Sequence, residues 1–490
     1  MRRGANHLGV PAIPSFESWL LGRFADVRSD TITVIGLLLS AAVTVHVLLR
    51  KRDVSAAVGW MGLAWLSPVV GSALYFFLGV NRVQRRAERA RRRAHRTGGS
   101  GSAPRVEIDA NLRAMENATR RLTHRTAEHG NAFEVLHNGD AAYPRMVEAI
   151  AAAEHSVALS SYIFRADEAG GRFIDALVEA HRRGVAVRVL IDGIGAGYFY
   201  SGTYRRLRRA GVKVQRFMHS ALPWRMPFLN LRTHKKILVV DGRIGFTGGM
   251  NIGRENVMAL HPRRPVRDTT FRIEGPVVAQ LVEAFALDWR FAAGEHLHGD
   301  RWYPTLSEVG PAVARVVTSG PDRDLDKIAL ALLQALACAE RSVRLMTPYF
   351  LPDERIITGL ALAAMRGVAV DVVIPRRSDH RYIDWATRAH VGPLIEAGVK
   401  IWRNPPPFAH TKLLVVDEAW SFVGSANWDT RSLRLNFELN MEVYDAELAQ
   451  KLDGFIQERA QILLKRAELE RIRLPWRLRD AAIRLCLPYL

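Results

Sequence analysis

The sequence predicts an α/β protein in which two pseudo-symmetric halves share one active site, preceded by a two-helix transmembrane hairpin. Three observations support this prediction: an internal duplication, a polar motif found once in each copy, and two uncharged runs near the N-terminus. A chain of 490 residues with 48% hydrophobic residues can form a large folded core, which excludes disorder throughout. The two cysteines are too few for a disulfide framework.

The net charge narrows the class of partner. The chain carries a formal charge of +20 and a sequence pI near 10.5. A surplus of this size indicates a polyanionic partner, either nucleic acid or an anionic membrane surface, although an arginine-rich composition alone would give the same total.

The N-terminal part predicts a membrane anchor. After residues 1–30, the run 31–49 contains no Asp, Glu, Lys or Arg, and at about 1.5 Å per residue it spans roughly the hydrocarbon thickness. A second uncharged run, 54–80, follows a four-residue connection, so 31–80 predicts a transmembrane hairpin. A cleaved signal peptide would explain only the first run, and a buried hairpin would explain both.

The following segment, 81–130, predicts a basic linker. Eight arginines lie within 82–96, and the stretch 98–102 contains only glycine and serine. Positively charged flanks face the cytoplasm, so we expect the catalytic part there, and a hairpin returns the N-terminus to the same side. The basic residues at 50–52 are a contrary signal.

From about residue 131 the chain repeats itself, which predicts one half over 131–300 and another over 301–470. The matching segments are AEHSVALSSYIF (153–164) with AERSVRLMTPYF (339–350), RRGVAVRVLID (182–192) with MRGVAVDVVIP (365–375), AGVKV (210–214) with AGVKI (397–401), and LVVD at 238–241 and 414–417. Helices and near-continuous apolar strands alternate in each copy, which is typical of a sheet covered on both faces.

Each copy contains one extended motif. The first is His234-x-Lys236-x4-Asp241-x6-Gly248-Gly249-x-Asn251, and the second is His410-x-Lys412-x4-Asp417-x6-Gly424-Ser425-x-Asn427. On a strand, HxK places both side chains on one face. We expect the small residues to let the backbone approach a ligand, beside the asparagine amide. Two such sets about a pseudo-two-fold axis suit a tetrahedral phosphate with an entering and a leaving oxygen.

This pattern resembles the phospholipase D superfamily, and its context is similar to bacterial cardiolipin synthases. The segments that carry the closer resemblance are NLRTHKKILVVDG (230–242), GGMNIG (248–253), RDTTFRIEGPVV (267–278), TPYFLPD (347–353) and RSLRLNFELN (431–440). The resemblance extends from about 31 to 470, and a basic amphipathic tail, 471–490, also suits the family.

The resemblance implies a phosphatidyltransferase that joins two phosphatidylglycerols into cardiolipin and glycerol through a phosphohistidine. It makes His234 the nucleophile and His410 the acid and base. The implied phosphate-binding residues are Lys236, Lys412, Asn251, Asn427, Gly249 and Ser425. The implied orienting residues are Asp268 for His234 and Glu438 for His410. No metal or cofactor is expected. Asp241 and Asp417 complete the catalytic motif, although a turn-forming role is favoured for both.

Other functions remain open at this stage. A hydrolytic phospholipase D uses the same residues with water as acceptor, and a transphosphatidylase could use another acceptor. A nuclease of the same superfamily suits the charge but gives no reason for a membrane anchor, and a lipid-binding scaffold would not need intact motifs. We therefore expect phosphatidylglycerol and anionic membrane lipids as partners, no nucleic acid, and a multi-pass protein of the inner (plasma) membrane. The apolar segment 222–228 suits either a packed loop or a lip that dips into the membrane.

Overall fold

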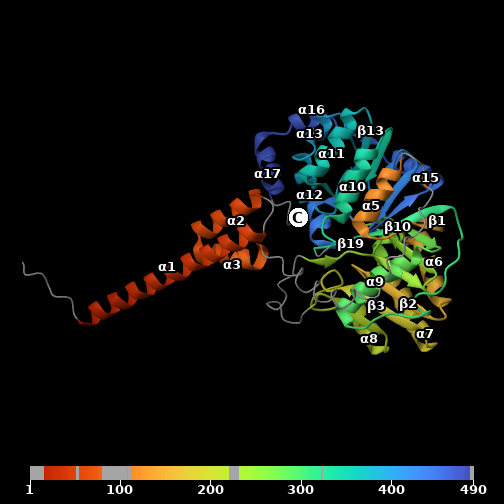
Figure 1. Cartoon of the computed structure of the whole chain (residues 1–490), viewed down its shortest axis with the longest axis horizontal. Coiled ribbons are helices and arrows are strands. Elements are labelled where there is room, and N and C mark those ends of the chain that lie inside the picture. The colour runs from red at the N-terminus through yellow and green to blue at the C-terminus, as the bar shows by residue number, and fades with distance from the viewer. Residues whose placement is uncertain are drawn as a thin grey trace, which may run out of the picture. The chain divides into compact units, whose positions relative to one another are not determined.

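The structure is a computed structural model (Figure 1) that describes residues 16–50, 54–79, 108, 112–219, 231–321 and 324–485. It divides into two compact units, Met1–Arg82 and Val83–Leu490. Several predicted features fall outside the described residues: the connection 51–53, the arginine run 82–96, the stretch 98–102 and the segment 222–228.

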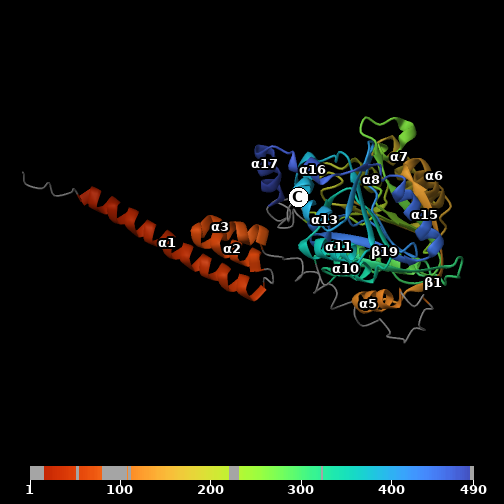
Figure 2. The same ribbon diagram turned by 90° about the horizontal axis from the view of Figure 1, so that it is seen from above.

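The first unit contains the apolar helices. Helix α1 spans Phe16–Arg50 (Figure 2). Its part Thr31–Arg50, with a mean hydropathy of 2.4, is the one helix among the described residues that is long and apolar enough to cross a membrane. The predicted first span, 31–49, lies within this helix, which begins earlier than the uncharged run.

The second uncharged run is not one helix. It forms α2 (Val54–Leu66), α3 (Pro68–Leu74) and a π-helical turn, η1 (Tyr75–Gly79). The chain bends at Ser67, because the backbone leaves the helical region there and Pro68 favours the first turn of a new helix. Both α2 and α3 pack on α1. The run 54–79 is therefore two short helices and a π-helical turn rather than one long helix, and the second membrane span stays a prediction.

The second unit contains the two halves. The first half contributes the strands β1 (Glu128–His137), β2 (Ser156–Ser161), β3 (Ala186–Asp192), β4 (Lys213–Phe217), β5 (Arg232–Thr233), β6 (Ile237–Val240), β7 (Ile244–Gly248), β8 (Val266–Arg267) and β9 (Thr269–Glu274). Its helices are α6 (Asn138–Ala151), α7 (Glu168–Arg182), α8 (Gly202–Arg209), α9 (Val278–Ala293) and the 3-10 turns η4 (Arg254–Asn256) and η5 (Met258–Leu260).

The second half repeats this order. Its strands are β10 (Ala312–Ser319), β11 (Ser342–Met346), β12 (Phe350–Leu351), β13 (Ala369–Pro375), β14 (Lys400–Asn404), β15 (Phe408–Ala409), β16 (Leu413–Val416), β17 (Trp420–Gly424), β18 (Trp428–Asp429), β19 (Asn436–Tyr444) and β20 (Ile462–Leu463). Its helices are α10 (Lys327–Cys338), α11 (Glu354–Met365), α12 (Arg381–Arg388), α13 (Gly392–Glu396), α14 (Thr430–Arg434), α15 (Ala446–Gln457), α16 (Arg466–Glu470) and α17 (Leu474–Arg484).

One 16-stranded mixed sheet runs through both halves. Its path is β20-β14-β13-β11-β16-β17-β19-β10-β1-β9-β7-β6-β2-β3-β4, and β5 pairs with β19 off this path. The order on one side of the β10–β1 seam mirrors the order on the other, as the duplication predicts. At the seam β1 and β10 pair antiparallel, with Glu128 opposite Ala314 and Asn131 opposite Ala312. The halves therefore form a single body rather than two separate domains.

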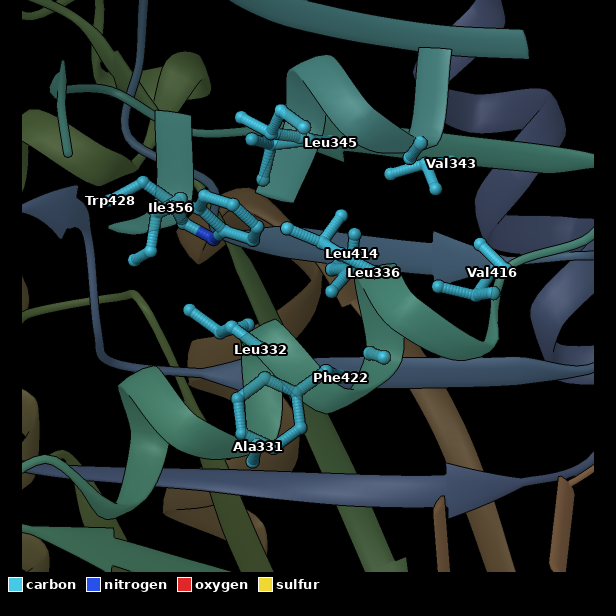
Figure 3. Close-up of a cluster of buried hydrophobic side chains, with 14 of the residues drawn as sticks. Ala331, Leu332, Leu336, Val343, Leu345, Ile356, Leu414, Val416, Phe422 and Trp428 are labelled. Carbon is cyan, nitrogen blue, oxygen red and sulfur yellow. The ribbon is translucent and has the colours of Figure 1, made fainter. Parts of the chain in front are cut away.

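Helices cover both faces of this sheet. In the second half, Leu332 and Leu336 of α10 pack against Leu414 of β16 and Phe422 of β17 (Figure 3). On the opposite face, α9 and α15 belong to one apolar core that draws on the strands of both halves. Because this core is continuous across the seam, it fixes the two halves relative to each other.

Two predicted boundaries need correction. Part of the expected linker 81–130 belongs to the folded body, because helix α5 (Arg113–Thr123) packs on α10 through Met115. Glu116 of this helix also pairs with the buried Arg315 at 3.3 Å. The expected tail, 471–490, contains α17, which packs on α12.

Candidate active site

The two HxK segments lie at joints between the halves. His234 and Lys236 follow β5, which pairs with β19 of the second half, and precede β6 of their own half. His410 and Lys412 likewise follow β15, which pairs with β8 of the first half, and precede β16. Contrary to the expectation from the sequence, the HxK segment does not lie in the interior of a regular strand. It is an extended connection whose backbone the opposite half holds.

Backbone hydrogen bonds fix each histidine to the opposite half. The N–H of His234 donates to the carbonyl of Phe437 at 2.9 Å, and the N–H of His410 donates to the carbonyl of Arg267 at 2.7 Å. The imidazoles face each other, with ring centroids 6.4 Å apart and planes at 81°. Both line one cavity of about 1150 Å³. The duplication therefore produces a single site.

The orienting carboxylates are exchanged between the halves. Nδ1 of His234 lies 3.1 Å from Glu438 Oε2, and Nδ1 of His410 lies 2.7 Å from Asp268 Oδ2. The expected pairing of Asp268 with His234 and of Glu438 with His410 is therefore wrong. The exchange arises because the short strand before each histidine pairs with a strand of the other half, so each imidazole lies beside the carboxylate of that half. An Nδ1–H donated to a carboxylate leaves the lone pair on Nε2, the other ring nitrogen.

A network of side chains holds Glu438. Its Oε2 accepts a hydrogen bond from Ser425 Oγ at 2.5 Å, and its Oε1 accepts from Ser432 Oγ at 2.5 Å and from Asn436 Nδ2 at 3.1 Å. Burial alone would raise the pKa of Glu438, but His234, the charge of Lys236 and the hydrogen bond from Ser425 outweigh it and lower the pKa. Glu438 thus stays ionised and fixed beside the imidazole.

The small residues of the motif make room for these carboxylates. Ser425 donates to Glu438, and at the equivalent Gly249 a Cβ atom would lie 2.4 Å from Asp268 Oδ1. Neither residue lines the cavity. Asn251 and Asn427 line the cavity, whereas the role of Gly249 and Ser425 in binding phosphate stays a prediction.

The two lysines lie behind the imidazoles. Lys236 and Lys412 are buried, and each donates from Nζ to the carbonyl of the histidine two residues earlier, at 2.6 Å for Lys236. Burial lowers the pKa of Lys236 to about 7 and that of Lys412 to about 8. An anion between the imidazoles would favour the charged form of both ammonium groups.

Burial also favours the neutral form of both histidines. It lowers the pKa of His234 to about 4 against the opposing effect of Glu438. The pKa of His410 is lowered as well, first by burial and then by the charge of Lys412, whose Nζ lies 2.9 Å from His410 Nδ1. A neutral imidazole is the nucleophilic form, so the site is set for attack at neutral pH.

The aspartates of the motif are structural. Asp241 accepts hydrogen bonds from the N–H groups of Glu154, His155 and Ser156 at 3.0, 2.7 and 2.8 Å. Asp417 makes the same three contacts at the start of β11, and each aspartate has a φ above +50°. Because three backbone N–H groups hold each carboxylate, these contacts favour the turn-forming role over a catalytic one.

Sequence reasoning missed the aromatic walls of the site. Tyr162 lies edge-on to His234, with ring centroids 5.0 Å apart, and Tyr349 lies edge-on to His410 at 6.1 Å. Both tyrosines occur near the end of the matching segments 153–164 and 339–350. In the alignment of these segments the two tyrosines are one position apart, since Tyr162 is opposite Pro348 and Tyr349 is opposite Ile163. The available signal was therefore an aromatic residue near the end of each segment rather than an identical position.

The fold and this paired site define a phospholipase D-like enzyme. The family model described as "Cardiolipin synthase, PLD-like domain" matches residues 146–289 and 332–459, one segment in each half. The chain belongs to this family and is a phosphatidyltransferase of the cardiolipin synthase type. The two matched segments contain both HxK motifs.

Curated relatives agree with this assignment over most of the chain. The chain is 31% identical over 460 residues to the "Major cardiolipin synthase ClsA" of Bacillus subtilis, which covers 90% of this chain and 95% of that protein. It is 32% identical over 446 residues to the cardiolipin synthase of Geobacillus kaustophilus, covering 89% and 87%. A solved phosphatidylserine synthase of Haemophilus influenzae has the same fold, with a TM-score of 0.60 and 14% identity over 78% of this chain and 100% of that one.

Proposed function

We propose that the chain transfers a phosphatidyl group from one phosphatidylglycerol to a second, giving cardiolipin and glycerol. The observation that carries this proposal is the pair of facing imidazoles, each bound at Nδ1 by a carboxylate of the opposite half. Such a pair can act on a single phosphorus atom from opposite sides, one ring as nucleophile and the other as acid and base.

In the first step His234 is the nucleophile. Its Nε2 attacks phosphorus, the bond from phosphorus to the headgroup glycerol oxygen breaks, and a proton from His410 goes to that oxygen. Burial and the charge of Lys412 lower the pKa of His410 and so favour its neutral form. The negative charge of the bound phosphodiester favours the protonated ring, so the substrate helps to supply the acid it needs.

In the second step His410 is the base. It takes the proton from a glycerol hydroxyl of the second phosphatidylglycerol, whose oxygen bonds to phosphorus while the phosphorus–nitrogen bond to His234 breaks. Lys236, Lys412, Asn251 and Asn427 would stabilise the negative oxygens in both steps. No metal or cofactor takes part in this scheme.

The proposed location is the inner (plasma) membrane, with the catalytic unit in the cytoplasm. Support comes from the apolar Thr31–Arg50 part of α1 and from the charge of +20, which suits anionic lipid headgroups rather than a nucleic acid partner in an anchored enzyme. We propose one span through α1, with α2 and α3 packed beside it.

The test is a product analysis. The purified full-length protein, reconstituted in vesicles, is given labelled phosphatidylglycerol. We expect labelled cardiolipin together with free glycerol. Phosphatidic acid as the only lipid product would contradict the proposal and indicate a hydrolase that uses water as acceptor.

A further inference from the structure

The cavity is symmetric at its centre and asymmetric at its walls. Around the two imidazoles, the first half contributes five of the six lining arginines, and the second half contributes Arg431. The second half instead adds the aromatic residues Tyr349, Tyr382 and Phe408. An anionic ligand beyond the reacting phosphate would therefore bind on the first-half wall.

Two arginines of that wall, Arg263 and Arg264, differ from their neighbours in having no partner among the described residues. Arg165 pairs with Glu255 at 2.8 Å, and Arg254 donates to the carbonyl of Leu260 at 3.0 Å. Arg263 and Arg264 are exposed and have no ion pair or side-chain hydrogen bond within the described residues. Two consecutive arginines that both line a cavity suit a phosphodiester, whose oxygens accept several hydrogen bonds at once.

The position of this pair relates it to one histidine. Arg263 and Arg264 lie between η5 and β8, and β8 pairs with β15, the strand that leads into His410. The carbonyl of Arg267 in β8 also accepts the N–H of His410. Arg263 and Arg264 are thus within four residues of β8, whose backbone is bonded to that of His410. In the proposed mechanism His410 activates the acceptor.

We propose that Arg263 and Arg264 form a binding site for the phosphodiester of the acceptor phospholipid. The inference rests on the proposed function and deepens it, because it concerns the second lipid rather than the first. The donor phosphate must lie between the imidazoles, while the acceptor phosphate is separated from the attacking hydroxyl by one glycerol. A cationic site beside His410 would hold the acceptor so that this hydroxyl reaches the base.

The experiment measures how one intermediate divides between two acceptors. The full-length protein in phosphatidylglycerol vesicles receives labelled glycerol, and both cardiolipin and label incorporated into phosphatidylglycerol are quantified. An enzyme that releases glycerol must also accept it in reverse, so glycerol is a neutral acceptor lacking the second phosphate. The ratio of the two products does not depend on how much protein is correctly folded.

We expect the double variant R263A/R264A to lower the ratio of cardiolipin to exchanged glycerol by about tenfold or more, because two charge-assisted contacts to the lipid acceptor are lost. The variant R263K/R264K should recover part of the ratio, since charge is kept but the forked geometry is not. R208A/R209A, an adjacent exposed pair in α8 away from the cavity, is the matched control and should keep the wild-type ratio.

Two results would overturn the inference. An unchanged ratio in R263A/R264A would show that the pair does not select the acceptor, and loss of both products would place it in the donor step instead. Glycerol exchange without any cardiolipin in the wild-type protein is a different result, because it would remove the proposed function itself.

Discussion

The chemistry at the scale of single residues depends on which carboxylate holds which imidazole. Glu438 contacts His234 and Asp268 contacts His410, so each variant of a carboxylate should resemble the variant of a histidine in the other half. Sequence could supply the four residues, the histidines through the repeated motif and the carboxylates through the family resemblance. It could not supply the pairing, since equivalent carboxylates in duplicated halves are interchangeable until the strands are placed in space.

This pairing predicts the fate of the covalent intermediate. His410→Ala should form the phosphatidyl-enzyme slowly and accumulate it, because no base remains to activate the acceptor, and Asp268→Asn should behave in the same way but more mildly. His234→Ala should give neither adduct nor product, and Glu438→Gln should approach that loss, with turnover falling on the order of 10² or more in each histidine variant.

Acid-quenched mass spectrometry after exposure to labelled phosphatidylglycerol measures the adduct in each variant. Adduct on His410 in the His234→Ala protein would invert the assignment of nucleophile and base. Accumulation of adduct in Glu438→Gln rather than in Asp268→Asn would contradict the exchanged pairing.

The lysines predict the pH dependence. In the free enzyme the pKa values of Lys236 and Lys412 are lowered to about 7 and about 8, chiefly by burial. An amine binds phosphoryl oxygens as an ammonium only below its pKa, so kcat/KM should fall as the pH rises through this range. A bound phosphodiester raises both pKa values, so the alkaline fall in kcat should lie at higher pH.

Initial rates over pH 5 to 10, at limiting and at saturating phosphatidylglycerol, test this prediction with the same preparation. On the acid side His234, whose pKa is lowered to about 4, stays neutral and nucleophilic across the whole range. A kcat/KM that stays constant up to pH 10 would show that the lysine charges do not contribute to binding.

At the scale of elements, prediction succeeded where periodicity extends over many residues. The strands and helices of each half follow from long apolar segments that repeat in order, as 153–164 and 339–350 show. The two-residue strands β5 and β15 carry no periodicity, yet they join each histidine to the opposite half. The bend at Ser67 was also missed, because an uncharged run predicts burial or lipid contact but not a straight helix.

The C-terminal helix α17 offers a prediction about a single element. Asp480 is buried and accepts hydrogen bonds from Arg388 of α12 at 3.0 Å and from Arg479 at 2.7 Å. Helix α12 carries Tyr382 and Ile383 of the cavity wall, so these contacts attach α17 close to the site. Its outer side exposes Trp476 at 53%, together with leucines and arginines, as the predicted amphipathic tail requires.

Asp480→Ala should release α17 without unfolding the sheet. Two partly exposed arginines lose one buried carboxylate, which should lower the local free energy of opening by about 1–3 kcal/mol. Hydrogen exchange should then speed up over 474–485 but not in β10 or β19. Arg477→Ala, at an exposed position of the same helix, is the control, and equal exchange in both variants would contradict the anchoring role of Asp480.

At the scale of the whole molecule, the two units have different tasks. The catalytic unit has a core that is continuous across the seam, and each of its histidines needs a carboxylate from the other half. Neither half can therefore hold a complete site alone. The first unit adds apolar surface instead, since Leu38 and Leu48 in α1 are 66% and 67% exposed, which suits a lipid environment.

Deleting residues 1–80 should consequently separate attachment from folding. The division between the units falls at Arg82, so the truncated protein should keep a folded catalytic unit while losing its apolar helices. Because the remaining chain is still basic, we expect it to stay on anionic membranes at low salt and to dissociate at high salt, whereas the full-length protein should resist both high salt and carbonate. Fractionation of membranes from cells that express each form measures this difference. Extraction of the full-length protein by salt or carbonate would show that α1 does not span the membrane.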